Sequence, residues 1–159
     1  MPRRTSRLRE REATFLPDAF VVDCSVCLPW YLEDEASDFC DRLASALGRA
    51  EIWVPSLWRA ELVSAVVNAQ RRKRMTSERR DAVLASADGL PIRVDDQMPS
   101  IAALDALTRE FALTPYDAVY VELARRRSLP LATLDKAMIN AARAANVSVI
   151  TDLRSFRKR

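Results

Sequence analysis

Four carboxylates are placed so that a parallel sheet would bring them together. Asp23 and Asp135 each follow a short apolar run, Asp117 follows a helix start, and Glu61 lies inside the helical segment after the second strand. The carboxyl ends of parallel strands and the adjoining helix N-termini share one edge of a sheet, where ligands bind. We therefore expect these four acids to converge.

The absence of histidine narrows the chemistry that such a cluster could perform. It excludes a Ser-His-Asp triad, a Cys-His pair and an imidazole general base. Converging carboxylates cannot all be ionised in one pocket without a cation. Oxygen ligands with room for water suit Mg²⁺ or Mn²⁺, which activate water and neutralise a scissile phosphate. The cluster therefore predicts metal-dependent hydrolysis of phosphodiesters.

Each acid also has an ordinary structural explanation. Asp23 and Asp135 stand where helix N-caps would stand, and Asp117 is three residues after Thr114, as in a capping box. Glu61 lies in the run ELVSAVV, where it could pair with a nearby arginine. A metal site is favoured, because otherwise four unrelated structural roles would have to place four acids at one edge of the sheet by coincidence.

Length and composition fit one domain. The chain of 159 residues is long enough for one compact α/β domain with a sizeable core. No apolar run is long enough to cross a bilayer and no signal-peptide core is visible, so we expect a cytoplasmic protein. Net charge is only +3, but nearly all basic residues are arginine, which suits phosphate contact or reflects a biased genome.

Three cysteines, Cys24, Cys27 and Cys40, raise the question of a zinc site, because the first two form a C-x-x-C. With no histidine and one further cysteine, such a site lacks ligands. Small buried residues after a strand are the favoured interpretation.

Short apolar runs alternate with helical patterns along the chain. This order predicts a three-layer α/β/α sandwich with a five-stranded, mainly parallel sheet. A basic, flexible arm at residues 1–18 precedes the folded domain at 19–153, and a basic tail occupies 154–159. Strands are expected at residues 20–22, 52–54, 91–94, 130–132 and 147–150, and helices at 36–47, 56–74, 77–89, 99–111, 115–127 and 137–142.

The stretch LTPYDAVYVELARRRSLPLATLD, which ends at Asp135, resembles the C-terminal half of PIN-domain nucleases. The most similar group is VapC, the toxin of bacterial toxin–antitoxin pairs. The segments VVDCS and PSLWRAELVSAV match the family's earlier acidic motifs, so the similarity covers about residues 20–150. Two departures are the long basic arm and Asn146, which stands where relatives often have glycine; Asn also suits a left-handed helix end.

The resemblance implies an endoribonuclease in which Asp23, Glu61, Asp117 and Asp135 hold one or two Mg²⁺ or Mn²⁺ ions. Ser25 and Thr133 match the hydroxyl residues that brace the acids in such proteins. The products would carry 5′-phosphate and 3′-hydroxyl ends. The RNA target depends on groove shape that one sequence does not display.

The resemblance also implies partners: an RNA substrate, a VapB-like antitoxin that covers the acids, and a second copy in a homodimer. Trp30, Tyr31 and Trp58 could anchor the antitoxin, with core packing as the favoured alternative. Basic residues at helix ends either contact the RNA backbone or are solvated. The candidates are Arg71, Arg72, Lys73, Arg74, Arg79, Arg80, Arg125, Arg126 and Arg127.

Two other function classes remain at this point. One is a catalytically idle RNA-binding or structural α/β domain. The other is a receiver-like phosphoryl-transfer domain that would use Asp23 with Asp95 or Asp96, although the tandem acids more simply indicate a turn or a helix N-cap.

Overall fold

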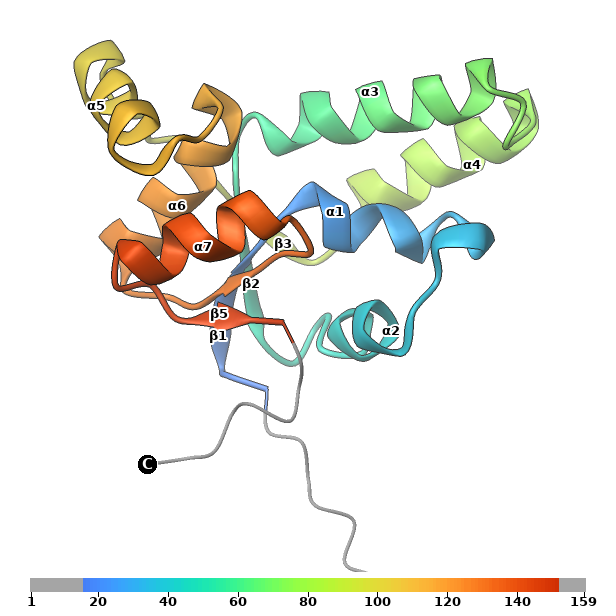
Figure 1. The fold of residues 1–159 in the computed structure, drawn as a ribbon. Helices are drawn as coiled ribbons and strands as arrows, with labels where there is room; N and C mark the ends of the chain where they lie inside the picture. Colours follow the sequence, from blue (N-terminus) through green and yellow to red (C-terminus); the bar gives the residue numbers. More distant parts are fainter. Residues whose placement is uncertain (1–15, 152–159) are drawn as a thin grey trace, which may run out of the picture.

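A computed structural model describes residues 16–151, in which helices surround one parallel sheet (Figure 1). Apart from residues 16–18, the expected N-terminal arm lies outside the described residues, as does the whole expected tail at 154–159. No helix within residues 16–151 is long and apolar enough to cross a lipid bilayer.

The sheet has five strands in the order β3-β2-β1-β4-β5, and every neighbouring pair is parallel. In the central strand, Phe20, Val21 and Val22 are all fully buried. Because successive side chains point to opposite faces, helices must cover both faces of the sheet. This confirms the predicted three-layer α/β/α architecture. The strands are β1 (Ala19–Val22), β2 (Glu51–Pro55), β3 (Ile92–Asp95), β4 (Leu131–Ala132) and β5 (Val149–Ile150).

The expected helices follow the predicted order; the one at 115–127 has the expected bounds, the one expected at 137–142 is longer, and the others are shorter. The helices are α1 (Cys24–Cys27), α2 (Asp38–Ala44), α3 (Trp58–Arg71), α4 (Ser77–Asp88), α5 (Ile101–Phe111), α6 (Pro115–Arg127) and α7 (Lys136–Ala144). Two short 3₁₀ turns, Leu28–Trp30 and Glu33–Glu35, follow α1. The sequence analysis missed α1 and both turns, because segments this short show no helical period.

Two expected helices were too long. The helix expected at 36–47 begins after its N-cap, Ser37, whose hydroxyl accepts from the backbone N–H of Cys40, and ends at Ala44. The helix expected at 56–74 ends at Arg71, because Lys73 has a left-handed backbone with φ of 60°. Asn146 adopts the same conformation, as predicted, with φ of 59°.

Several of the aromatic and cysteine residues singled out in the sequence pack in the core or against it. Trp58 is only 3% exposed, so the core-packing interpretation holds for it. Trp30 is half-buried and donates its indole N–H to the carbonyl of Cys40. Cys27 and Cys40 are buried free thiols, which agrees with the packing interpretation of the cysteines.

Two helix pairs flank the carboxyl edge of the sheet. Helix α3 packs on α4, on the right of Figure 1, and α5 packs on α6, on the left. The inward face of α6 contributes Tyr120, Val121 and Leu123 to the core. The N-terminal part of α6 and the first turns of α3 therefore border the edge where β1 ends.

Candidate active site

Asp23 directly follows β1 and is held by two hydroxyls. It occupies the N-cap position of α1, yet its side chain makes no capping hydrogen bond. Instead its Oδ2 accepts from Ser25 Oγ at 2.5 Å and from Thr133 Oγ1 at 2.8 Å. The aspartate is 6% exposed and Thr133 is fully buried. Asp23 therefore has the backbone position of a helix N-cap, but its carboxylate does not cap the helix.

The same two hydroxyls connect Asp23 to the loop that follows β4. Ser25 Oγ accepts from the backbone N–H of Leu134 at 3.1 Å, and Thr133 Oγ1 accepts from that of Asp135 at 3.0 Å. Because each hydroxyl oxygen accepts from an N–H, its own proton is directed to Asp23. Burial raises the pKa of Asp23; the two hydroxyls oppose this, and the negative charge of Asp117 adds to it.

Glu61 reaches the same region from α3 and is held by a buried phenol. Its Oε2 accepts from the hydroxyl of Tyr120, which lies on α6 and is 1% exposed. Burial raises the pKa of Glu61, the Tyr120 hydrogen bond opposes this, and the charges of Asp23 and Asp117 raise it further. Because the charges of both Asp23 and Asp117 act on Glu61, the three acids share one electrostatic environment.

Asp117 is held by the hydroxyl that caps its own helix. Its backbone N–H donates to Thr114 Oγ1 at 3.2 Å, while that hydroxyl donates to Asp117 Oδ2 at 2.7 Å. The predicted cap at Thr114 is therefore present. It also leaves Asp117 with the same kind of partner as Asp23 and Glu61, a neutral hydroxyl donor.

Asp135 is placed differently from the other three acids. It is exposed and caps α7, because its Oδ1 accepts from the backbone N–H of Met138 at 2.8 Å. Its charge is not among the causes that shift the pKa of Asp23 or Glu61. The structure thus joins Asp135 to Asp23 through Thr133, and brings Asp23, Glu61 and Asp117 together electrostatically.

The chemistry of these donors fits a hard divalent cation, although the side chains do not form a closed cage. Within residues 16–151, no three Cys, Asp or Glu side chains are grouped closely enough to hold a metal ion. In the same part of the chain, Asp23, Glu61 and Asp117 have no ion pair with lysine or arginine. Each hydrogen-bonded hydroxyl occupies one carboxylate oxygen, Oδ2 or Oε2, which leaves oxygen ligands of the type that Mg²⁺ prefers.

A groove of about 600 Å³ opens beside Glu61 between α1, α3 and the start of α6. Tyr116 and Asn68 line it, together with Leu57 and Ser64. The sequence analysis assigned no role to Tyr116 or Tyr120, although both lie in the motif TPYDAVY. A tyrosine on an otherwise apolar helix face was the available signal, since a buried hydroxyl needs a partner.

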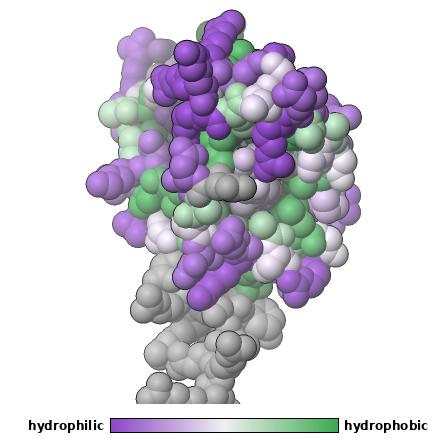
Figure 2. Space-filling model, turned by 90° about the vertical axis from the view of Figure 1, so that its right-hand side faces the viewer, coloured by the Kyte–Doolittle hydropathy of each residue, from purple (hydrophilic) through white to green (hydrophobic). Residues whose placement is uncertain are grey.

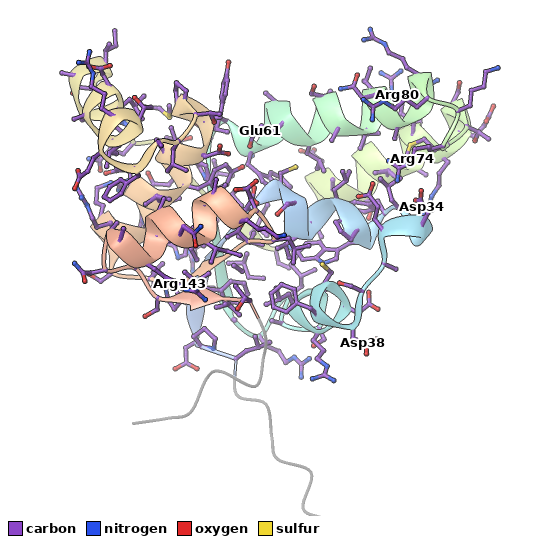
Figure 3. All side chains as sticks on the ribbon, in the orientation of Figure 1. Asp34, Asp38, Glu61, Arg74, Arg80 and Arg143 are labelled. Carbon is purple, nitrogen blue, oxygen red and sulfur yellow. The ribbon has the colours of Figure 1, made fainter. Side chains whose placement is uncertain are left out.

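The first basic cluster lies away from the acids. Arg71, Arg72 and Lys73 are exposed at the end of α3, about 15 Å from Glu61 at 1.5 Å per helical residue. Arg74 pairs with Asp34 and Glu35, and Figure 3 shows it with Arg80 at the opposite end of α3–α4 from Glu61. Figure 2 looks onto that end, where hydrophilic side chains gather over the upper part of the surface.

The second basic cluster is largely engaged within the protein. Arg126 and Arg127 both pair with Asp95, at 3.1 Å and 2.5 Å, and Arg127 also lies over the ring of Trp53. Burial opposes ionisation of Asp95, but the hydrogen bonds from the two arginines outweigh it and lower its pKa. The turn after β3 is present, since the N–H of Gln97 donates to Asp95. The charge of Asp95 is therefore balanced by two arginines, which makes this residue unsuited to the receiver-like role. The third arginine of this cluster, Arg125, is exposed.

Comparison with known proteins agrees with this geometry. The family model described as PIN domain matches residues 20–144. Ribonuclease VapC3 of Mycobacterium tuberculosis is 31% identical over 125 residues, which cover 79% of this chain and 88% of the relative.

Solved structures share the fold at low identity. FitAcB from Neisseria gonorrhoeae has a TM-score of 0.62 at 17% identity, covering 86% of this chain and 99% of that one. A toxin-antitoxin complex from Klebsiella pneumoniae has a TM-score of 0.55 at 16% identity, covering 83% and 96%. The family match and the curated relative together lead to one conclusion: this chain belongs to the PIN domain family, among its VapC-type members.

Proposed function

We propose that the protein is a Mg²⁺- or Mn²⁺-dependent endoribonuclease and the toxin of a toxin–antitoxin pair. The observation that carries this proposal is the set of acids at the end of β1. Asp23, Glu61 and Asp117 share one environment, and each is held by a neutral hydroxyl, without a basic partner among the described residues. In their ionised forms these acids have no counter-charge among the described residues, so a cation from outside would stabilise them together.

Asp23, Glu61 and Asp117 would hold the cation, with Asp135 added from the loop that Thr133 ties to Asp23. When bound, it would supply an acidified water and a counter-charge for the scissile phosphate. The hydroxyls of Ser25, Thr133 and Tyr120 orient Asp23 and Glu61 and favour their ionised forms, because each donates a hydrogen bond to a carboxylate oxygen. The hydroxyl of Thr114 orients Asp117 in the same way. Products with 5′-phosphate and 3′-hydroxyl ends remain part of the proposal.

The partner in this proposal is a VapB-like antitoxin. It is supported by the relation to VapC3 and by the structural neighbour described as a toxin-antitoxin complex. The antitoxin would cover the acids and the adjoining groove, and the toxin would pair with a second copy of itself. Arg71, Arg72 and Lys73, being exposed, remain candidates for RNA backbone contact some distance along the strand from the acids.

One observation favours a second candidate, an RNA-binding domain that does not cleave. The acids do not form a closed metal cage in the described structure. The two candidates differ in whether a divalent cation changes what the protein does to RNA.

The test is cleavage of total RNA by purified protein, free of antitoxin, in Mg²⁺ or Mn²⁺ and in EDTA. We expect discrete fragments only with the metal, and none with Asp23→Asn. The matched control is Asp96→Asn, an exposed aspartate directly after β3, which should cleave like the wild type. Fragments that persist in EDTA or in Asp23→Asn would refute the catalytic assignment, and RNA binding without cleavage would favour the second candidate.

A further inference from the structure

The groove beside Glu61 has walls of two kinds. One wall is a single face of α3 together with its N-cap, Leu57. Along it Leu57, Glu61, Ser64 and Asn68 recur at spacings of four, three and four residues. The opposite side carries Tyr116, the second residue of α6, which is 65% exposed and directly precedes Asp117. The groove is therefore continuous with the acid cluster, since Glu61 belongs to both.

The lining chemistry excludes a phosphate as the occupant. Glu61 is the only charged residue that lines the groove among the residues that the structure describes, and no lysine or arginine does. A phosphate here would face a carboxylate with no counter-charge. A neutral, planar and partly polar group suffers no such repulsion.

A nucleobase meets each condition of this lining. The exposed ring of Tyr116 offers a stacking surface, which every base can use. Leu57 and Leu28 provide apolar contact, while Asn68 carries an amide that both donates and accepts, as is needed to read a base edge. A volume of about 600 Å³ leaves room for one unpaired base with its sugar.

We propose that this groove is a nucleobase subsite. It takes the unpaired base next to the phosphate at the acid cluster, with Tyr116 stacking on the base and Asn68 contacting its edge. The subsite rests on the proposed function for the position of the phosphate, but binding of a base can be measured without cleavage. A protein segment, from an antitoxin or a second copy, is the competing occupant.

The first experiment measures binding of short single-stranded RNA to the Asp23→Asn protein with Mg²⁺ present. Tyr116→Leu, which keeps an apolar side chain but removes the ring, should weaken binding about tenfold to a hundredfold. Tyr116→Phe keeps the ring and should bind within about threefold of its parent. Met98→Ala, at another exposed apolar side chain after β3, is the control and should change nothing.

A second measurement identifies the base. RNAs with a single abasic position are compared on the Asp23→Asn protein and on its Tyr116→Leu derivative. One abasic position should weaken binding to the first protein, yet have little effect on the second, because the stacking partner is already lost. Asn68→Ala should alter the preference among the four bases at that position and leave the other positions unchanged.

The outcomes separate the subsite from the proposed nuclease. If Tyr116→Leu binds every RNA like its parent, the subsite is wrong, whether or not the wild type cleaves. If Tyr116→Leu weakens self-association or antitoxin binding and leaves RNA binding intact, the groove is a protein contact and the proposal is overturned. If wild-type protein fails to cleave but the abasic effect appears, the nuclease fails and the subsite stands.

Discussion

Asp23 and Asp95 lie at the ends of two parallel strands, and their carboxylates have different kinds of hydrogen-bond partner. Both residues are buried, with exposed fractions of 6% and 4%. Asp23 accepts from two hydroxyls, whereas Asp95 accepts from two arginines, Arg126 and Arg127. The pKa of Asp23 is raised by burial, while the pKa of Asp95 is lowered, because its arginine hydrogen bonds outweigh its burial.

Under the proposed function, this difference separates a metal-binding acid from a structural one. A hydroxyl supplies a hydrogen bond but no charge, so among the described residues Asp23 has no positive partner beside Glu61 and Asp117. Burying an unpaired charge is unfavourable, and folding alone gives no reason to keep it. Asp95 is already neutralised, and its two arginines join the end of β3 to α6. The comparison predicts which substitutions impair chemistry and which impair stability.

The largest expected effect is on cleavage by Asp23→Asn. We expect the rate to fall at least about a thousandfold, or about 4 kcal/mol of transition-state stabilisation, because a charged metal ligand is lost. The free energy of unfolding should stay the same or rise, since a buried charge is removed. Single-turnover cleavage and urea unfolding of the same preparation measure both. A variant that is inactive only because it is unfolded would not support the account.

Asp95→Asn should show the reverse pattern. Loss of the charge leaves two guanidinium groups without their carboxylate, and breaking such a pair is expected to cost about 2–4 kcal/mol of unfolding free energy. We place the value near the low end because both arginines remain partly exposed. Cleavage per folded molecule should stay within about twofold of the wild type, a change of less than 0.5 kcal/mol. Asp96→Asn is the control; a catalytic defect in folded Asp95→Asn protein would break the comparison.

Tyr120→Phe tests whether the hydroxyl partners matter. The variant keeps the buried ring and removes only the donor to Glu61. Because this hydrogen bond is made to a charged group that would bind the metal, we expect its removal to lower Mn²⁺ affinity or the cleavage rate about tenfold. In a Glu61→Gln background the same change should have almost no further effect, because the two residues act as one unit. Additive losses would show that the hydroxyl of Tyr120 acts independently of Glu61.

The fold could be predicted from the sequence more fully than the partners of the two aspartates. Apolar runs and helix signals were sufficient to predict the parallel sheet, because each run is local and buried on both faces. The same local rules missed α1, which is only four residues long. The arginine partners of Asp95 are more than thirty positions away in the chain, and Tyr120 is 59 positions from Glu61.

Nothing in one sequence distinguishes an acid that will meet an arginine from one that will meet a hydroxyl. Ser25 and Thr133 were both expected through the family resemblance, and only Ser25, two residues from Asp23, is near its partner in the sequence. The placement of Asp23, Glu61 and Asp117 near one edge of the sheet was therefore predictable, whereas their electrostatic state and the separate, exposed position of Asp135 required the fold.

The smallest expected effect is the pH dependence of stability in metal-free protein. Asp95 has a lowered pKa, so its contribution is present above the unfolded-state value of about 3.9 and is lost as pH falls through the folded-state value. Asp23 has a raised pKa, so stability falls as pH rises through its folded-state value. Relative to wild type, Asp23→Asn should gain stability as pH rises above about 4. Asp95→Asn should instead lose stability as pH rises toward about 4, where the contribution of Asp95 becomes complete. Urea unfolding in EDTA from pH 3.5 to 7 measures both slopes, and equal signs would contradict the assignment.

The most direct test of the central claim is Mn²⁺ binding, measured by calorimetry on the wild type, Asp23→Asn and Asp95→Asn. The account predicts that wild type and Asp95→Asn bind Mn²⁺ alike, and that Asp23→Asn binds it at least about a hundredfold more weakly, or about 2.7 kcal/mol. A wild type that binds no Mn²⁺, or an Asp23→Asn protein that binds it as well as the wild type, would contradict the account.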